Sequence, residues 1–470
     1  MVTSTTEPAR SQWGSRVGFI LAAAGSAVGL GNLWKFPYIT GENGGGAFVL
    51  IYLVCILVVG LPIMIAEVLL GNMTQKSPVG AFTEHAPKSA WPAFGWLGIA
   101  GGFIILSYYS VVAGWAMHFT YLSVIGTFSD VPPDEIGAVG EHFGALYADP
   151  TLNLAWHTVF MAVTMAIVIA GIQKGVETAA RIMMPTLLLM LGGMALYGSS
   201  LDGFGRAFDF VFGFHTDALS SAGVLEALGH SFFTLSLGMG AMLTYGSYMK
   251  RDEDVVSSGV AITLLDTGVA LLACLALFPI TFTYDMEASA GPGLVFVNMP
   301  TAFAQLPGGS LLAVLFFLLL TFAALTSAVS LLEVVASYFI DEMKVPRRVA
   351  VAGCAGVIFL FGIPSALSGG TDFFGADFAT MTSQVFGEGE GKNWFDLLDY
   401  LATNWMLPLG GLGVSLFVGW RINGLERHHA LADGSPLGQI VPLYTAWLWI
   451  LRIVVPIAIV LVMLHAVGIL

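Results

Sequence analysis

Carboxylates, amines and hydroxyls are scarce inside the long apolar segments of this chain, and one group of them has the spacing of a cation site. Ala323, Thr326 and Ser327 stand at positions i, i+3 and i+4, so two hydroxyls and a carbonyl would share one face of a helix. An oxygen-only ligand set suits a hard cation such as Na⁺. Hydroxyls of membrane helices also commonly bond to the carbonyl four residues earlier, and the spacing alone leaves that alternative open.

Five ionisable residues lie within apolar segments, where charge is costly and usually functional. They are Lys35, Glu67, Asp266, Glu333 and Arg452. Glu67 is a candidate acceptor for backbone amides freed by a helix break, and its alternative is a carboxylate at the membrane interface. The sequence has neither a His-Glu-x-x-His nor a Gly-x-Ser-x-Gly motif. These carboxylates are not paired at catalytic spacing, so we do not expect an enzyme.

Glycine pairs interrupt two apolar segments at mid-length. GLG at 29–31 lies in the segment 17–40, and GMG at 238–240 lies in the segment 224–249. Unwound backbone survives in lipid only where it lines a cavity or binds something. Freed carbonyls attract a cation and freed amides attract an anion, so the two breaks together suit a small zwitterion beside a metal ion. A close helix contact through the small residues at 25–29 is the alternative for the first break.

The elements that must position these residues are transmembrane helices. Of the 470 residues, 56% are hydrophobic and 10% are charged, and about 20 apolar helical residues cross a bilayer core. We expect eleven spans, near 17–40, 47–71, 96–125, 154–173, 178–199, 224–249, 256–284, 309–340, 349–365, 395–420 and 442–468. The interrupted spans are the first and the sixth. Because five spans invert the topology, this is the pattern of transporters built from inverted repeats.

The expected fold is therefore a single all-α integral membrane domain over residues 1–470, with a five-plus-five inverted-repeat transporter fold and broken helices 1 and 6. We expect the first repeat, spans 1 to 5, to cover 17–200. The second repeat, spans 6 to 10, would cover 224–422, and 441–468 would form an extra span.

Lysine and arginine fall mainly in one set of alternating connecting segments: thirteen lie there against two, Arg206 and Lys392, in the opposite loops. This asymmetry predicts a multi-pass protein of the cell (inner) membrane with a cytoplasmic N-terminus, and the odd number of spans then puts the C-terminus outside. A cleaved signal peptide over the first apolar stretch is the alternative. The net charge of −14 argues against nucleic acid as a partner, which leaves the lipid bilayer and small molecules.

Four stretches, taken in order, resemble the neurotransmitter:sodium symporter family. They are GSAVGLGNLWKFPY at 25–38, NGGGAF at 43–48, FFTLSLGMGAMLTYGSY at 232–248 and ALTSAVSLLE at 324–333. Within the family, the chain looks like a bacterial amino-acid transporter with eleven spans. The resemblance extends from about residue 10 to residue 420. It implies a transporter that holds one amino acid and two sodium ions at the broken helices and imports them by alternating access.

The resemblance also implies which residues bind. One sodium ion would be held by the Ala27 carbonyl, Asn32, Thr234, Asp266 and the substrate carboxylate. The other would be held by the carbonyls of Gly25, Val28 and Ala323 and the hydroxyls of Thr326 and Ser327, which include the face inferred above from spacing. The substrate would contact Ser26, Ala27, Leu30, Gly31, Ile105, Tyr109, Phe233, Thr234, Ser236, Met239, Ser327 and Leu331.

Two features narrow the expected substrate to a hydrophobic or neutral L-amino acid. Monoamine transporters of the family place an acidic residue at the position of Gly29 to meet the amine, whereas glycine leaves the negative charge to the substrate. The side chains of Ile105, Met239 and Leu331 would form apolar walls, one of them flexible.

Two gates follow from the same resemblance. The outer gate would consist of Lys35, Asp399, Tyr109 and Phe233, and the inner gate of Arg10, Trp13, Tyr248 and Asp341. Ordinary positive charge at the cytoplasmic side is the alternative for Arg10. The family usually has arginine at the position of Lys35. Lysine keeps the charge but loses the planar fork, so we expect a looser outer gate.

Asp266 stands where the family often has asparagine, and Ala270 and His230 stand where relatives form a chloride site or supply a carboxylate. Two sodium ions beside a net-neutral zwitterion need a nearby negative charge, which Asp266 can supply. We therefore expect chloride-independent transport, with proton counter-movement if Asp266 is protonated once sodium has left. The family's twelfth span is missing, which leaves a monomer or a weak homodimer.

Two alternatives to sodium-driven transport stay open on this evidence. One is a proton-driven amino-acid carrier of similar architecture, against which Asn32, Thr326 and Ser327 argue. The other is an amino-acid sensor that does not transport. A channel is not expected, because the sequence shows no ring of like residues and no repeated pore loop.

Overall fold

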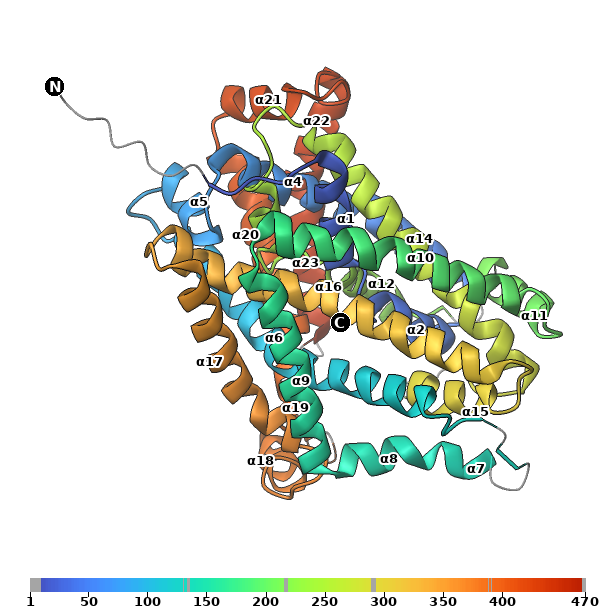
Figure 1. Ribbon diagram of the computed structural model, residues 1–470. Coiled ribbons are helices and arrows are strands. Elements are labelled where there is room, and N and C mark those ends of the chain that lie inside the picture. The colour runs from blue at the N-terminus through green and yellow to red at the C-terminus, as the bar shows by residue number, and fades with distance from the viewer. Residues whose placement is uncertain are drawn as a thin grey trace.

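All regular secondary structure in the described part of the chain is helical. The computed structural model describes residues 10–129, 131–132, 136–214, 219–288, 293–387, 389 and 391–466. The short helices α5 (Pro78–His85) and α21 (Gly424–Ala432) lie at one end of the helical bundle, and α8 (Glu141–Ala148) and α18 (Ala376–Phe386) lie at the other (Figure 1). We call the end with α5 and α21 the N-terminal face, because Arg10 lies there, bonded to the Gln75 carbonyl just before α5.

The first half of the chain supplies five of the expected spans, several of which contain a π-helical stretch (η). Their elements are α1 (Arg16–Ala27), η1 (Gly31–Lys35), α2 (Phe36–Glu42), α3 (Gly46–Cys55), η2 (Ile56–Gly60), α4 (Leu61–Thr74), α6 (Pro92–Val124), α9 (Pro150–Ile169), η3 (Ile172–Glu177) and α10 (Thr178–Gly198). Two further short helices, α7 (Ile136–Val139) and α11 (Phe204–Phe212), lie outside these spans.

The second half supplies the remaining spans. Their elements are α12 (Ser221–Thr234), α13 (Ala241–Gly246), α14 (Val255–Thr283), α16 (Gly309–Asp341), α17 (Arg347–Leu367), α19 (Trp394–Leu401), η5 (Ala402–Met406), α20 (Leu407–Leu416), η6 (Phe417–Arg421), α22 (Val441–Trp449), η7 (Ile450–Val454) and α23 (Val455–Ala466). η4 (Leu294–Asn298) and α15 (Met299–Phe303) form a short connecting segment.

Within the described residues, nine helices are long and apolar enough to cross a membrane, and the bent pair in the first span makes a tenth. The expected sixth span is divided into α12 and α13, neither of which is long enough alone. The total of eleven spans and the division into two repeats therefore stay predictions. Residues 467 and 468 of the expected last span, and residues 1–9 of the expected domain, lie outside the described residues.

The two longest helices, α6 and α16, form the centre of the bundle, where they pack against each other. In the most apolar 18-residue stretch of each of these two helices, 78% is buried. In the corresponding stretch of α9 and of the last span, only 33% is buried. An apolar helix surface that is not covered by protein must be covered by lipid. The bundle therefore has a protein-packed centre and a lipid-facing periphery, and the candidate site lies against the central pair.

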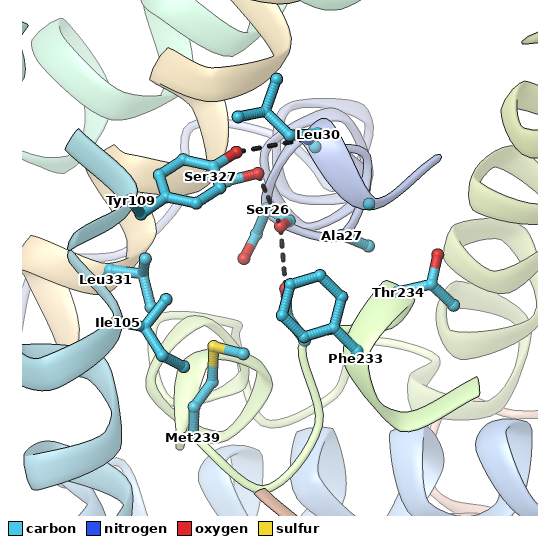
Figure 2. A pocket seen from close by; sticks show the side chains of 13 residues that line it. Ser26, Ala27, Leu30, Ile105, Tyr109, Phe233, Thr234, Met239, Ser327 and Leu331 are labelled. Atoms are coloured by element: carbon cyan, nitrogen blue, oxygen red, sulfur yellow. Dashed lines mark hydrogen bonds between the residues drawn. The ribbon is translucent and has the colours of Figure 1, made fainter. Parts of the chain in front are cut away.

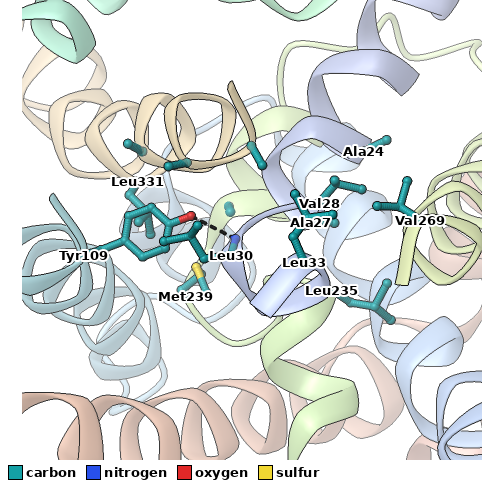
Figure 3. Packing of buried hydrophobic residues seen from close by; sticks show 14 of the residues in the cluster. Ala24, Ala27, Val28, Leu30, Leu33, Tyr109, Leu235, Met239, Val269 and Leu331 are labelled. Carbon is teal, nitrogen blue, oxygen red and sulfur yellow. Dashed lines mark hydrogen bonds between the residues drawn. The ribbon is translucent and has the colours of Figure 1, made fainter. Parts of the chain in front are cut away.

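The first span breaks directly after α1. Val28 leaves the helical conformation (φ −67°, ψ 101°), and the helices on either side of the break are bent by 52°. The side-chain oxygen of Asn32 accepts a hydrogen bond from the N–H of Gly29 at 3.1 Å, which stabilises the turn. Val28 lies toward Val269 of α14 and Leu235 of the other break (Figure 3), so apolar packing covers one side of it.

The sixth span breaks between α12 and α13, as the glycines at 238 and 240 predicted. Ser236, Gly238 and Gly240 have φ of 53°, 80° and 75°, a region that glycine enters without steric cost. A Cβ added to Gly238 would lie 2.0 Å from the carbonyl oxygen of Leu407 in α20. Gly238 is therefore required both by its backbone conformation and by its close contact with α20.

We expect Gly238→Ala to lower the free energy of unfolding by about 2–5 kcal/mol, from left-handed strain and from the clash with α20. Thermal unfolding of the detergent-purified protein measures this loss. Gly268→Ala in α14 is the matched control, because a Cβ there meets nothing within 4 Å and alanine favours a helix. Equal melting temperatures for the two variants would contradict the assignment.

Candidate functional site

A small cavity of about 30 Å³ lies where the two breaks meet α6 and α16 (Figure 2). It is lined by Ser26, Ala27, Gly29, Leu30, Gly31, Ile105, Tyr109, Phe233, Thr234, Ser236, Met239, Ser327 and Leu331. All twelve residues that the sequence predicted as substrate contacts are among these thirteen, and Gly29 is the addition. Four separate helical segments, far apart in sequence, therefore converge on one cavity, which we call the central pocket.

Hydrogen bonds fix the polar wall of the central pocket. The N–H of Leu30 donates to the Tyr109 hydroxyl at 3.3 Å, and the Ser327 hydroxyl donates to the Ser26 carbonyl at 3.1 Å (Figure 2). The Ser236 hydroxyl donates to the same carbonyl at 2.8 Å. The first break thus exposes an amide and a carbonyl within one turn. Both are already partnered by side chains that reach in from α6, from α16 and from the second break.

Gly29 has no room for a side chain in this arrangement. A Cβ at Gly29 would lie 2.6 Å from the Ser327 hydroxyl oxygen and 3.1 Å from that of Tyr109. An acidic side chain at this position would therefore require Ser327 to move. The opposite wall is apolar, because Ile105, Met239 and Leu331 face the same space (Figure 2).

The residues of the cation site inferred from the α16 spacing lie together beside the first break. The Ser327 hydroxyl is 3.5 Å from the Gly25 carbonyl oxygen and 3.4 Å from that of Val28. The Thr326 hydroxyl is 3.0 Å from the Ala323 carbonyl oxygen, to which it donates. Three carbonyls and two hydroxyls thus lie close together, a donor set that suits a hard cation. The back-bonding alternative is visible as well, since Thr326 also donates to the Phe322 carbonyl at 3.1 Å.

The residues expected at the other sodium site form a second buried cluster. The side-chain amide of Asn32 donates to an oxygen of Asp266 at 2.7 Å and to the Thr234 hydroxyl at 3.0 Å. Thr234 in turn donates to the other oxygen of Asp266 at 3.0 Å. Ala27 lines the central pocket together with Thr234. The structure therefore links the first break, α12 and α14 through a fully buried carboxylate.

Glu67 lies where the sequence predicted an acceptor for freed amides. One oxygen of Glu67 accepts the N–H of Gly238 at 2.6 Å, and the residue is fully buried in α4. The other oxygen is buried as well, and the backbone of Leu243 in α13 also interacts with this carboxylate. The interface alternative is wrong for this conformation, because a fully buried carboxylate is not at a surface.

A larger cavity of about 260 Å³ lies next to the central pocket, on the side away from the N-terminal face. We call it the outer cavity; it shares Leu30, Gly31, Tyr109 and Phe233 with the central pocket. The predicted outer-gate residues line it. Among the described residues, Lys35 and Asp399 form no ion pair: the Lys35 ammonium lies 5.0 Å from the Phe233 ring centre, and Asp399 accepts from the Tyr108 hydroxyl at 2.9 Å.

The predicted inner-gate residues are in contact at the N-terminal face. Arg10 pairs with Asp341 at 2.8 Å, and its guanidinium lies 4.6 Å from the ring centre of Tyr248. Trp13 is 2% exposed, and its indole donates to the Tyr245 carbonyl at 2.9 Å. In this conformation the N-terminal face is closed, whereas the central pocket adjoins the outer cavity.

The sequence analysis did not predict several contacts that extend the inner gate and the polar wall of the central pocket. The Tyr248 hydroxyl donates to buried Glu333 at 2.7 Å, and Arg347 pairs with the same carboxylate. The Ser26 hydroxyl donates to Ser330 at 2.7 Å. The position of Ser330 could have been predicted from the sequence, since it lies three residues after Ser327 and thus on the same helical face. The Arg347 contact was not, because it joins two helices.

Comparison with known proteins agrees with this geometry. The model of the sodium:neurotransmitter symporter family matches residues 10–130 and 149–467. An uncharacterized sodium-dependent transporter, YhdH of Bacillus subtilis, is 37% identical over 460 residues, which cover 98% of both chains. The sodium-dependent transporter MJ1319 of Methanocaldococcus jannaschii is 33% identical over 446 residues, covering 89% of this chain and 84% of the relative. The crystal structure of MhsT in complex with L-phenylalanine matches with a TM-score of 0.87 and 40% identity, over 97% of this chain and 100% of MhsT.

Two broken spans surround a buried pocket with two clusters of polar groups beside it, and the matching family is one of secondary transporters rather than enzymes. With the family model matching most of its length, the chain belongs to the sodium:neurotransmitter symporter family. It is a multi-pass membrane protein that takes a small-molecule substrate and depends on sodium.

We expect Lys35→Arg to slow dissociation of bound substrate about three- to ten-fold, because a guanidinium can bind Asp399 through two parallel bonds. Release of labelled substrate after dilution of the loaded protein measures this rate. Lys392→Arg is the matched control, since Lys392 lies over the rings of Phe386 and Tyr400 instead. An unchanged release rate in the Lys35 variant would count against its role as a gate.

Proposed function

We propose that this transporter imports a hydrophobic or neutral L-amino acid with two sodium ions by alternating access. The observation that carries the proposal is that none of the thirteen side chains lining the central pocket carries a charge. A substrate with net charge would lie in a low-dielectric pocket without a counter-charge, which is unfavourable. An amino acid zwitterion brings both charges and needs only dipoles and a cation beside it.

The two ends of the pocket suit the two ends of an amino acid. The N–H groups at the start of η1, near Leu30 and Gly31, together with the Tyr109 hydroxyl, can bind a carboxylate. The oxygens of Ser26 and Ser236 can accept from an ammonium group. The apolar wall opposite would receive the side chain, and MhsT, which matches this chain closely, was crystallised with L-phenylalanine.

Each cluster of oxygens described above would hold one sodium ion. The Ala27 carbonyl and the side-chain oxygens of Thr234, Asp266 and Asn32 would bind the ion that also touches the substrate carboxylate. The Asn32 side chain would turn on binding, so that its oxygen and not its NH2 group faces the ion. The second ion would be bound by Gly25, Val28, Ala323, Thr326 and Ser327. Binding of substrate and ion would then be mutually dependent, because the carboxylate completes the first ion's ligands.

Alternating access requires that the two sides open in turn. We propose that the N-terminal face is cytoplasmic, which agrees with the distribution of basic residues, and that residues 17–200 and 224–422 are the inverted repeats. The Arg10–Asp341 pair would separate to release substrate inward, after Lys35 and Asp399 have closed the outer cavity.

We expect reconstituted protein in liposomes to accumulate labelled apolar amino acids, such as leucine, methionine or phenylalanine, only when sodium is outside. Counterflow screened over the twenty common amino acids identifies the substrate, and replacing sodium by choline tests the coupling. Uptake that persists in choline would indicate a proton-driven carrier. Saturable binding without counterflow would indicate a sensor.

Thr326→Val tests the second ion site in the same assay. Loss of one ligand hydroxyl, about 1–2 kcal/mol, should raise the sodium concentration for half-maximal uptake about ten-fold. Thr321→Val is the matched control, because Thr321 is also buried in α16 and back-bonded, to the Phe317 carbonyl. Equal sodium dependence in the two variants would refute this ion site while leaving the substrate assignment intact.

Chloride independence is the expected consequence of the Asp266 carboxylate. Uptake by the unmodified protein should continue in gluconate buffer, whereas Asp266→Asn should become chloride-dependent or lose most uptake, because two cations then lack a counter-charge. Asp396→Asn in the outer cavity is the control and should stay chloride-independent. Unmodified protein that stops in gluconate would contradict this prediction. If Asp266 also takes up a proton on the return step, uptake should be accompanied by outward proton movement.

A further inference from the structure

Arg452 is a charged residue in the last membrane-spanning segment that takes no part in the transport site. It lies in η7, between α22 and α23, and its Nε donates to the carbonyl of Gly419 in η6 at 2.8 Å. Its guanidinium carbon is 4.5 Å from the ring centre of Trp420 and 5.7 Å from that of Trp449. A cation in a membrane span is costly without compensation, so this arrangement calls for an explanation.

The contacts of Arg452 with the protein satisfy only part of its guanidinium. The group has five N–H donors, and among the described residues only the Gly419 carbonyl accepts from it. No carboxylate of the described residues pairs with it. Trp420 and Trp449 are 58% and 50% exposed, so the rings border the guanidinium at the periphery of the bundle. Its terminal nitrogens are left to bind a partner outside the protein.

A second arginine lies close by. Arg421, the last residue of η6, is exposed and forms no ion pair within the described part of the chain. It comes two residues after Gly419, whose position Arg452 contacts directly: a Cβ at Gly419 would be 3.2 Å from the Arg452 side chain. Three arginines therefore lie around Gly419 where the tenth and eleventh spans meet. Arg452 and the buried Arg427 both donate to the Gly419 carbonyl, at 2.8 and 3.2 Å, and Arg421 follows two residues later in the same helix.

The position of this group across the membrane is set by its neighbours. α21 begins three residues after Arg421, and Glu426 of α21 lies 3.9 Å from His85 of α5. Both short helices lie at the N-terminal face (Figure 1). The tenth span ends at Arg421, on the side of the N-terminal face, and Arg452 reaches that end from within the last span by its bond to Gly419. Tryptophan rings at the ends of spans contact lipid headgroups.

We propose that Arg452, Arg421, Trp420 and Trp449 bind the phosphate of an anionic phospholipid in the leaflet at the N-terminal face. A guanidinium binds two phosphate oxygens through parallel hydrogen bonds, and basic pockets between membrane helices suit anionic headgroups. The acyl chains would run along the exposed side chains of α23, such as Ile457, which is 56% exposed. The lipid would join the last span to the tenth, whose opposite end carries Asp399.

Binding of a defined lipid to the full-length protein tests this site. Purified protein in detergent micelles is titrated with phosphatidylglycerol or phosphatidylcholine brominated on the acyl chains, and tryptophan quenching reports binding. We expect the dissociation constant for phosphatidylglycerol to be at least five-fold lower than that for phosphatidylcholine, since each basic residue near the surface contributes about that factor. The difference should shrink in high salt.

Variants separate this site from general attraction to the surface. Arg421→Gln should weaken phosphatidylglycerol binding about five-fold, and Arg452→Lys should weaken it further, because lysine loses the planar fork. Arg348→Gln is the matched control, since Arg348 is exposed at the start of α17 on the same face; it should bind as the unmodified protein does.

Two results would overturn the proposal. One is equal affinity of the unmodified protein for the two lipids. The other is equal binding by Arg421→Gln and the Arg348 control. Among the described residues Arg421 has no hydrogen-bond partner, so its substitution should not destabilise the fold. The Arg421→Gln variant therefore tests lipid binding even if changes at Arg452 disturb its contact with Gly419.

Discussion

Inside a bilayer every backbone amide and carbonyl needs a partner, and this requirement governs both broken spans. The amide of Gly29 is held by Asn32, the amide of Gly238 by Glu67, and the carbonyl of Ser26 by two serine hydroxyls. Each partner comes from another turn or another helix. The breaks are therefore stable only in the assembled bundle, and two of the stabilising residues, Ser236 and Ser327, also line the central pocket.

Charge is arranged in layers along the bundle. No side chain that lines the central pocket is charged. The buried carboxylate of Asp266, which accepts from the pocket residue Thr234, is bound by an amide and a hydroxyl rather than by a basic group. Full ion pairs occur at the N-terminal face, where Arg10 pairs with Asp341 and Arg347 pairs with Glu333. The Asp266 carboxylate thus has no basic partner among the described residues, whereas the closed face is held by charges that already compensate each other.

How much the sequence predicted depends on the range of the interaction. The helical spans, the break at 238–240 and the shared face of Ala323, Thr326 and Ser327 on α16 follow from spacings of at most a few residues. The structure contains these three features, whereas binding of a cation to that face stays a prediction. The twelve predicted pocket residues came from family motifs and not from spacing, and they converge on one cavity. The expected pairing of Lys35 with Asp399 is not formed in this conformation, because Lys35 lies over Phe233 and Tyr108 binds Asp399.

The sequence by itself determined that the chain lies in a membrane, where its helices must break and which side chains could meet an ion, because hydropathy, glycine and helical periodicity are local properties. Only the tertiary structure decided that Glu67 reaches Gly238, that Arg347 reaches Glu333 and that Arg452 lies between two tryptophans. Glu67 and Gly238 are far apart in sequence, and even the nearer pairs join different helices. Such contacts arise from how helices cross, and crossing depends on the shape of whole packed surfaces rather than on any single motif.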